Sequence, residues 1–445
     1  MDGILKRMLD NNKRVQEAAA SAFANLEEQA NKELENPKYC EVIARQFAEC
    51  FSKYKDRNMF ILYDCVQTLA EHVGPTLQSP ELVHSLMPAL LKRWEKVTDQ
   101  SREMFPLLEC LSYVATALGN TFQPYAGPIF ERCIRIIATN LQDAMQAVNR
   151  PELDDPDKDF LVTSLDLLSA IIQALNEKES ARLVANSQPS MFDLLVYCLE
   201  DSNNDVKQSA YALLGDCAIY IFASMQSSLD RILNVLVGQL DLEQAMSDDD
   251  NDFAVTNNAC WACGEITLKA QAAMAPYAET FLQRFYAILC SDKVAQLHDN
   301  AATSLGRLGL GCPEILAAHL VTLAPPFLKV MRGIEWSEEK ATAVVGFAQA
   351  VVANPQGLEQ CLPQFMGEIA RAPLAGDVIS RTVPYELFQR VSSSSYAAIL
   401  VGALLMCIPL VQILSAYKQL VPNFEQFLQS LPQEEQQNLK STYTI

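Results

Sequence analysis

Glycine, histidine and positive charge are all scarce in this chain of 445 residues. It has 16 glycines and contains neither GxGxxG nor GxxxxGK[ST], so it offers no glycine-rich loop for a nucleotide phosphate. The four histidines (His72, His84, His298 and His319) form no HxxxH pair, which leaves little basis for a zinc site or a histidine-dependent triad. Lys and Arg number 34 against 54 Asp and Glu, a net charge of −20 that disfavours nucleic acid and favours basic partners.

The thirteen cysteines are spread without paired spacing, and no signal-peptide pattern is evident. This indicates reduced thiols rather than a disulfide framework. Cys260 and Cys263 have the CxxC spacing, but they lie in a helical pattern with no second pair and no strand before it. Structural thiols are favoured there, and a thiol oxidoreductase stays open as a rival that a Cys263→Ala variant would test. We expect a non-enzymatic protein without cofactor or metal.

Half of the residues are hydrophobic, which is too many for a disordered chain. Apolar residues recur at helical spacing of three and four, as in the series Val15, Ala18, Ala19, Ala22, Phe23 and Leu26. Alternating, strand-like segments are scarce, and Pro or Asn/Asp/Ser clusters recur about every 15–25 residues, as helical hairpins require. The sequence therefore predicts an all-α fold.

Small residues recur at fixed offsets along the chain. The glycines Gly215, Gly264, Gly306 and Gly346 lie 49, 42 and 40 residues apart, and an alanine stands five residues before each. Small residues at fixed places on a helix allow neighbouring helices to approach closely. A period near 40 with two helices per unit is typical of HEAT repeats. We expect one superhelical solenoid, a right-handed α-α superhelix, in place of separate globular domains.

The repeat predicts nine hairpins over residues 1–391, with approximate bounds 1–36, 37–76, 78–120, 124–178, 184–224, 227–272, 276–312, 313–355 and 357–391. Two acidic segments, 151–159 and 247–252, read as loops. For both, solvated connectors are favoured over specific binding sites.

Several carboxylates stand alone in otherwise apolar helical stretches; they are Asp64, Glu109, Asp166, Asp216 and Glu265. Because burying a lone carboxylate is costly, each is expected to face water or a partner. The second helix of each repeat lines the usual binding surface of a solenoid. For any single acid, the polar stripe of an amphipathic helix is the simpler explanation. For the set, we favour a negative groove that attracts a basic peptide.

Trp261 lies on the same predicted helix as Glu265 and follows Asn257 and Asn258. Asn side chains can bond an extended peptide backbone, and Trp offers flat apolar area at low entropic cost. A Trp packed between helices fits the pattern equally well.

Four strings closely resemble the transportin (karyopherin-β2) family of the importin-β superfamily. They are 4–19 (ILKRMLDNNKRVQEAA), 105–112 (FPLLECLS), 157–160 (DKDF) and 257–266 (NNACWACGEI). The resemblance covers about 1–391 and resumes near 417–445. It implies a nuclear import receptor that binds cargo with basic proline-tyrosine localisation signals, many of them RNA-binding proteins, and releases it to Ran-GTP.

The resemblance also implies site residues by position. The acids that engage basic signal residues correspond to Glu28, Asp64, Glu71 and Glu109, with Glu71 where the family often has Asp. A second region, for the hydrophobic or basic N-terminal part of the signal, corresponds to Asp166, Asp216, Phe253, Trp261, Val294 and Thr303, flanked by Asn257, Asn258 and Asn300. Thr303 replaces a larger aliphatic residue, which weakens that wall.

The chain departs from the family in what it lacks. It resembles only the C-terminal half, so the Ran-binding repeats, the long acidic loop and the seat of the proline-tyrosine pair are absent. We expect that the chain alone keeps part of the cargo groove without completing regulated import. The family further implies nucleoporin partners and shuttling between cytoplasm and nucleus; neither direct nucleic-acid nor membrane binding is expected.

An apolar segment at 392–416 interrupts the resemblance, and 417–445 is expected to form a C-terminal helical cap. No charged residue occurs between Arg390 and Lys418, so 396–414 is a marginal transmembrane candidate that Pro409 and Gln412 weaken. A sequence artefact is favoured, followed by a genuine apolar insertion and then a membrane anchor. For the whole chain, the rival to an import receptor is a generic HEAT scaffold for assembling protein complexes.

Overall fold

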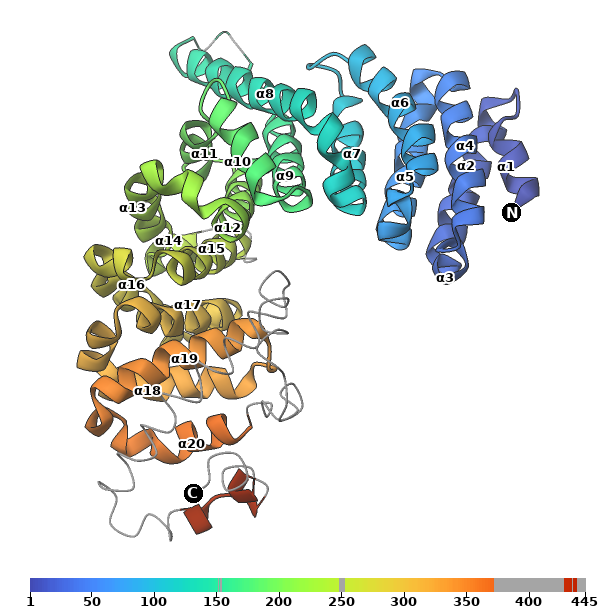
Figure 1. Ribbon diagram of the computed structural model, residues 1–445. Helices are drawn as coiled ribbons and strands as arrows, with labels where there is room; N and C mark the ends of the chain where they lie inside the picture. Colours follow the sequence, from blue (N-terminus) through green and yellow to red (C-terminus); the bar gives the residue numbers. More distant parts are fainter. Residues whose placement is uncertain (151, 153, 248–252, 372–427, 434, 438–445) are drawn as a thin grey trace. The chain divides into compact units, whose positions relative to one another are not determined.

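The computed structural model describes residues 1–150, 152, 154–247, 253–371, 428–433 and 435–437. Within these ranges the regular structure consists of α-helices and short 3₁₀ helices without a strand, which confirms the predicted all-α fold. The chain forms two compact units, 1–229 and 230–445 (Figure 1), and each is described by itself. The expected insertion at 392–416 lies outside the described residues, as does most of the expected cap at 417–445.

Unit 1 consists of successive helical hairpins (Figure 1). Its helices are α1 (Asp2–Met8), α2 (Lys13–Gln29), α3 (Asn31–Leu34), α4 (Pro37–Lys53), α5 (Met59–Val73), α6 (Pro80–Lys96), α7 (Met104–Leu118), α8 (Gln123–Asn149), α9 (Asp159–Ala174), α10 (Glu177–Asn186), α11 (Met191–Leu199) and α12 (Asn204–Met225), with 3₁₀ turns η1 (Asp56–Asn58), η2 (Gly74–Gln78), η3 (Gly119–Phe122) and η4 (Gln226–Ser228). The second helices of successive hairpins pack side by side. They form the second-helix layer of unit 1, which consists of α2, α5, α7, α9 and α12.

Unit 2 repeats this arrangement. Its helices are α13 (Leu229–Gln239), α14 (Leu242–Ser247), α15 (Ala254–Ala270), α16 (Ala275–Leu289), α17 (His298–Gly311), α18 (Pro313–Gly333), α19 (Glu338–Ala353) and α20 (Leu362–Ala370), with η5 (Gln271–Met274), η6 (Asp292–Leu297) and η7 (Pro355–Cys361). Here α15, α17 and α19 pack in series as the second-helix layer of unit 2. The predicted bounds of the nine hairpins stay a prediction: α10 crosses the boundary expected between 178 and 184, and residues 372–391 of the ninth expected hairpin lie outside the described residues.

Several of the Asn, Ser and Pro residues that recur along the sequence lie at the starts of helices. Asn36 accepts a hydrogen bond from the Lys38 backbone N–H, and Pro37 occupies the first position of α4. Ser79 and Pro80 begin α6 in the same way. A capping side chain satisfies one of the free N–H groups of the first turn, and proline at the first position needs no such partner.

The repeated glycines mark contacts between neighbouring second helices. A Cβ added to Gly306 of α17 would overlap the backbone of Ala343 in α19, and one added to Gly346 would overlap the Gly306 carbonyl. Because any side chain at these positions would push the helices apart, glycine explains how closely α17 and α19 pack.

Two helical stretches, Asn204–Gln239 and Pro313–Gly333, are long and apolar enough to pass a membrane-span test by length and composition alone. In each, 44% of the apolar window is buried. Leu316, Leu320 and Phe327 of α18 lie in the core of unit 2. Packing between helices thus accounts for much of this apolar character.

Candidate functional site

The four acids expected to contact basic residues all lie in the second-helix layer of unit 1. Glu28 is in α2, Asp64 and Glu71 are in α5, and Glu109 is in α7, and all four are exposed. They occupy the polar stripes of helices whose remaining faces are apolar and buried.

Acids on adjacent helices are close enough to influence one another. Partial burial and the neighbouring Glu28 carboxylate raise the pKa of Asp64 above its usual value. Burial, followed by the carboxylates of Asp166 and Asp159, likewise raises the pKa of Glu109. Burial is the larger cause of both shifts, and like charges add to it, because a nearby negative charge disfavours ionisation. The acids therefore form two sets of like charge, one across α2 and α5 and one across α7 and α9.

Asp166 and Asp216 differ in their surroundings. Asp166 of α9 keeps part of its surface exposed, and burial of the rest raises its pKa, which a hydrogen bond from Ser209 opposes. Asp216 of α12 is buried and accepts hydrogen bonds from the Ser169 hydroxyl and from Gln173 Nε2, the latter at 2.9 Å. Asp216 is therefore satisfied by α9 side chains and does not face open solvent, contrary to the expectation from its sequence.

The expectation that Glu265 faces water or a partner molecule is also wrong. Its side chain is buried in α15 and forms an ion pair with Arg307 of α17, with Oε1 and Nη1 2.6 Å apart. Arg307 Nε also donates to the Thr342 hydroxyl in α19 at 2.9 Å. A buried charge needs such a partner, and this one comes from the next repeat.

Exposed aromatic side chains accompany the acids. Phe60 precedes Asp64 by one turn of α5, and Tyr113 follows Glu109 by one turn of α7. Phe60 is 45% exposed and Tyr113 38% exposed. The sequence reasoning missed both, although the four-residue spacing of acid and aromatic was visible. Together they offer a carboxylate and a flat apolar surface to a basic side chain.

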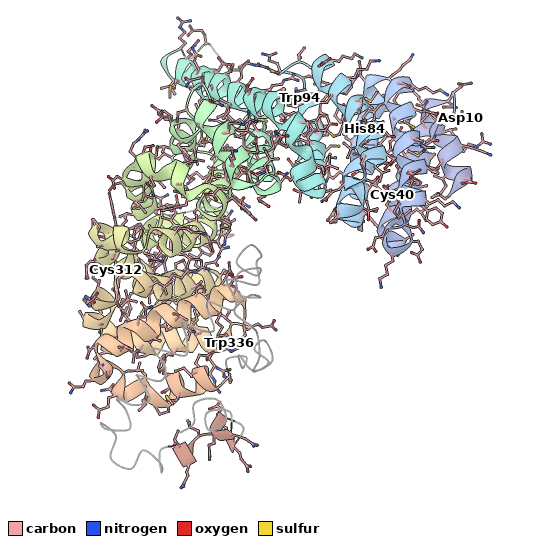
Figure 2. The ribbon with its side chains drawn as sticks, viewed as in Figure 1. Asp10, Cys40, His84, Trp94, Cys312 and Trp336 are labelled. Carbon is pink, nitrogen blue, oxygen red and sulfur yellow. The ribbon has the colours of Figure 1, made fainter. Side chains whose placement is uncertain are left out.

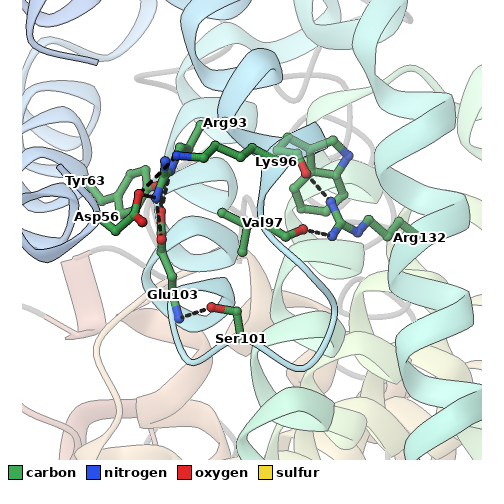
Figure 3. Close-up of polar contacts among 9 residues, drawn as sticks. Asp56, Tyr63, Arg93, Lys96, Val97, Ser101, Glu103 and Arg132 are labelled. Atoms are coloured by element: carbon green, nitrogen blue, oxygen red, sulfur yellow. Dashed lines mark hydrogen bonds and ion pairs between the residues drawn. The ribbon is translucent and has the colours of Figure 1, made fainter. Parts of the chain in front are cut away.

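A buried polar cluster fixes the helices that present these acids (Figure 3). Arg93 of α6 contacts both carboxylate oxygens of Glu103 at 2.5 Å, and its Nη2 donates to Asp56 at 2.8 Å. The Tyr63 hydroxyl donates to Glu103 Oε1 at 2.7 Å. Tyr63 directly precedes Asp64, and Glu103 directly precedes α7, so the cluster ties α5 to the start of α7.

A second set of contacts joins α8, the first helix of the next hairpin, to the end of α6. Arg132 donates to the backbone carbonyls of Trp94 and Val97 (Figure 3). Its Nε also donates to Asp99 at 2.6 Å. Its guanidinium also lies 4.4 Å from the centre of the ring of Trp94, a residue of α6 that is labelled in Figure 2. Arg132 of α8 thus binds the end of α6 and the segment that follows it, through two backbone carbonyls and the Asp99 carboxylate.

In unit 2, three of the expected residues line one cavity of about 400 Å³: Asn257, Asn300 and Thr303. Asn300 Nδ2 donates to Asn257 Oδ1 at 3.0 Å, which links α17 to α15. Asp299 and Glu339, from the first turns of α17 and α19, line the same cavity. The sequence reasoning missed these two acids because the cavity depends on how the preceding loops pack.

The other expected residues of unit 2 lie around α15. Trp261 and Asn258 are half-buried, so each keeps accessible surface. Phe253 is nearly buried, with φ of 47°, just before α15 begins. Val294 is fully buried and presents no surface to a ligand.

Cys260 and Cys263 are both fully buried, and burial raises the pKa of each thiol. A thiolate is the reactive form of cysteine, so burial disfavours reaction at these two thiols. Among the described residues, no cluster of His, Cys, Asp and Glu has the geometry of a metal site.

Residues 3–231 match the family model described as "Importin subunit beta-1-like, TPR repeats". The chain is 39% identical over 367 residues to importin subunit beta-2 of Schizosaccharomyces pombe, covering 82% of this chain and 39% of that protein. It is 38% identical over 372 residues to transportin-1 of Homo sapiens, covering 83% and 40% respectively. The chain thus spans about two fifths of the length of these relatives, and the resemblance seen in its sequence is confirmed.

Solved structures agree on the fold. A crystal structure of importin beta superposes with a TM-score of 0.52 at 13% identity, covering 100% of this chain and 53% of that one. An engineered protein gives a TM-score of 0.51 at 15% identity, covering 93% and 98%. At these identities the likeness concerns the helical-repeat fold alone.

Proposed function

We propose, from the premise that this chain belongs to the importin-β family, that it binds basic segments of cargo proteins for nuclear import. The binding surface is the acidic side of the second-helix layer of unit 1, and the residues that contact the basic part of the signal are Glu28, Asp64, Glu71 and Glu109. Cargo of this kind carries a basic localisation signal, which complements a chain with a net charge of −20.

The observation that supports the proposal most is the repulsion between acids on adjacent helices. Asp64 lies near Glu28, and Glu109 lies near Asp166. Within the described part of the chain, no lysine or arginine forms an ion pair with Asp64 or Glu109. A cationic side chain placed between such acids removes the repulsion and gains attraction at once, so the arrangement favours a basic ligand.

The N-terminal part of the signal is assigned, by the same proposal, to one further set of residues in each unit. In unit 1 the set is Asp166 and Asp216, of which Asp166 is the accessible one. In unit 2 it is the accessible face of Trp261 and the Asn257–Asn300 pair with its cavity, together with the buried Phe253 and Val294. A half-buried Trp and paired amides suit an extended peptide, whose backbone needs donors and acceptors.

Proline-tyrosine signals, release by Ran-GTP, contact with nucleoporins and shuttling between cytoplasm and nucleus belong to the proposal for the receptor as a whole. For the 445 residues here, the proposal is narrower: binding of the basic part of the signal and of its N-terminal part. RNA-binding proteins are the cargo class that the resemblance implies.

A peptide-based binding measurement tests the proposal. A fluorescent peptide with a basic proline-tyrosine signal is titrated with the chain, alongside a peptide of equal length in which Lys and Arg are replaced by Gln. We expect measurable binding of the basic peptide alone, cross-linking of a photoreactive analogue to α5 or α7, and weaker binding by a Trp261→Ala variant. Equal binding of both peptides, or cross-links confined to the first helices of the hairpins, would refute the proposal.

A further inference from the structure

A separate cavity of unit 1 lies where α8 meets the start of α9. Its volume is about 250 Å³, which suits one side chain better than a drug-sized ligand. One face of α8 provides Ile136, Thr139, Asn140 and Asp143, and the opposite wall includes Pro156 and Phe160. None of these residues belongs to the site described above.

Asn140 gives this cavity an unused acceptor. The residue is 6% exposed, and its Nδ2 donates to the backbone carbonyl of Asp157 at 2.8 Å. Its Oδ1 is buried and accepts no hydrogen bond from any residue that the structure describes. Asp157 also lines the cavity, so the Asn140 amide sits at this wall. Leaving a buried acceptor without a hydrogen bond is costly, and a donor entering from the cavity would relieve that cost.

The charged residues that line the cavity are three aspartates, and one of them forms ion pairs with arginine. Asp99 also lines it but is engaged by Arg132 at 2.6 Å and by Arg135 at 3.2 Å. Asp143 is exposed, and no partner for its carboxylate occurs in the part of the chain that the structure describes. Asp157 Oδ1 accepts the Asp159 backbone N–H at 3.2 Å. A cationic donor therefore fits this cavity better than an anion or a neutral acceptor.

The remaining walls are apolar. Ile136 and Pro156 contribute aliphatic surface, and the Phe160 ring packs on Phe105 with ring centres 4.4 Å apart. Lysine and arginine place a methylene stem along apolar surface while the charged head reaches polar groups. The cavity has both parts of that environment.

We propose that this cavity receives the head of one lysine or arginine side chain from the peptide bound on the acidic face. This inference rests on the proposed function. Phe105 lies one turn before Glu109 on α7, and Asp159, beside Phe160, acts electrostatically on Glu109. The cavity therefore adjoins the acidic face through Phe105, Asp159 and Phe160.

The test is methyl NMR of the full chain labelled at isoleucine δ1 methyl groups, with the basic peptide as probe. Ile136 lines the cavity and is its reporter. We expect the Ile136 signal to shift on peptide addition, with affinity about fivefold weaker in Asp143→Asn, since a partly exposed ion pair contributes about 1 kcal/mol. Thr139→Phe, which fills the cavity without changing charge, should abolish the shift.

Glu131→Gln is the matched control, because Glu131 is an exposed acid of the same helix outside the cavity. It should bind as the wild type does. If the peptide binds while the Ile136 signal stays fixed, or if Asp143→Asn and Glu131→Gln behave alike, this inference is wrong and the proposed function stands. If the peptide perturbs no methyl signal and shows no binding, both are wrong. A shift produced equally well by free N-acetyl-lysine methylamide would assign the cavity to small amines and overturn its role in peptide binding.

Discussion

Asp64 of α5 and Glu28 of α2 are acids of adjacent helices whose like charges act on each other across the exposed side of the second-helix layer. Such a pair works against the stability of the free protein. A cation placed beside the pair would remove this repulsion. The pair therefore indicates where a basic ligand binds, which the net charge of the chain does not.

Replacing Asp64 should therefore improve folding while it weakens binding. We expect Asp64→Asn to raise the free energy of unfolding by a few tenths of a kcal/mol at pH 7, because an exposed pair is screened by solvent. Its folded-state pKa is raised, so the destabilisation it causes is absent below about pH 3.8 and develops as pH rises toward the folded value. Urea unfolding at pH 3.5 and pH 7 would measure this. A loss of stability at pH 7 would contradict the account.

Glu27, next to Glu28, is a more extreme case. Its side chain is fully buried, and neither carboxylate oxygen has a hydrogen-bond partner within the described ranges. Burial, with a smaller effect of Asp64, raises its pKa from 4.5 to about 10. The folded state therefore holds this carboxyl protonated at neutral pH, while the unfolded state ionises it.

The linkage has a definite sign. A raised folded-state pKa means that stability falls by about 1.4 kcal/mol per pH unit as pH rises from 4.5 toward 10. Glu27→Gln removes this loss, so we expect it to be more stable than wild type by roughly 3.5 kcal/mol at pH 7 and nearly equal at pH 4.5. Urea unfolding across this range measures it, with Glu28→Gln as the control. Identical pH profiles for the two variants would refute the assignment.

Glycine substitutions separate helix propensity from packing. In an exposed helix, Gly→Ala stabilises by about 0.5–1 kcal/mol, and this is what we expect for Gly238 of α13, which is exposed and has open space at its Cβ position. At Gly306 the added methyl would lie 2.5 Å from the Ala343 carbonyl oxygen. There the overlap outweighs propensity, and Gly306→Ala should destabilise by about 1–3 kcal/mol. Thermal unfolding of both variants decides this; a stabilised Gly306→Ala would show that the helices separate easily.

The sequence predicted what is local. Helical periodicity and the spaced small residues gave the hairpins, because both depend on positions within one repeat. The exposure of Asp64, Glu109 and Asp166 followed from the polar stripe of each helix. It failed for Asp216 and Glu265, whose partners Ser169 and Arg307 lie 47 and 42 residues away on the neighbouring second helix. Such partners depend on side-chain direction between repeats, which periodicity alone does not reveal.

The unit 2 cavity could not be predicted for a related reason. Asn257 and Asn300 were identified by resemblance, but Glu339 joins them only because the segment after α18 brings the start of α19 to the same wall. The geometry of the loop before α19 decides whether Glu339 lies near the two asparagines, and residue spacing in the sequence does not predict that geometry.

The most direct test of the acidic face is a pair of charge-reversed variants measured against the basic signal peptide. Asp64→Lys/Glu109→Lys reverses two acids of the second-helix layer, and Glu95→Lys/Glu131→Lys makes the same charge change at exposed positions of α6 and α8. Fluorescence anisotropy at 50 and 200 mM salt gives each affinity.

The account predicts that the first variant loses at least about tenfold in affinity at low salt and most of its salt dependence, while the second stays within about threefold of the wild type. Equal losses in the two variants would mean that the peptide responds to net charge alone, and would contradict a binding face on α5 and α7.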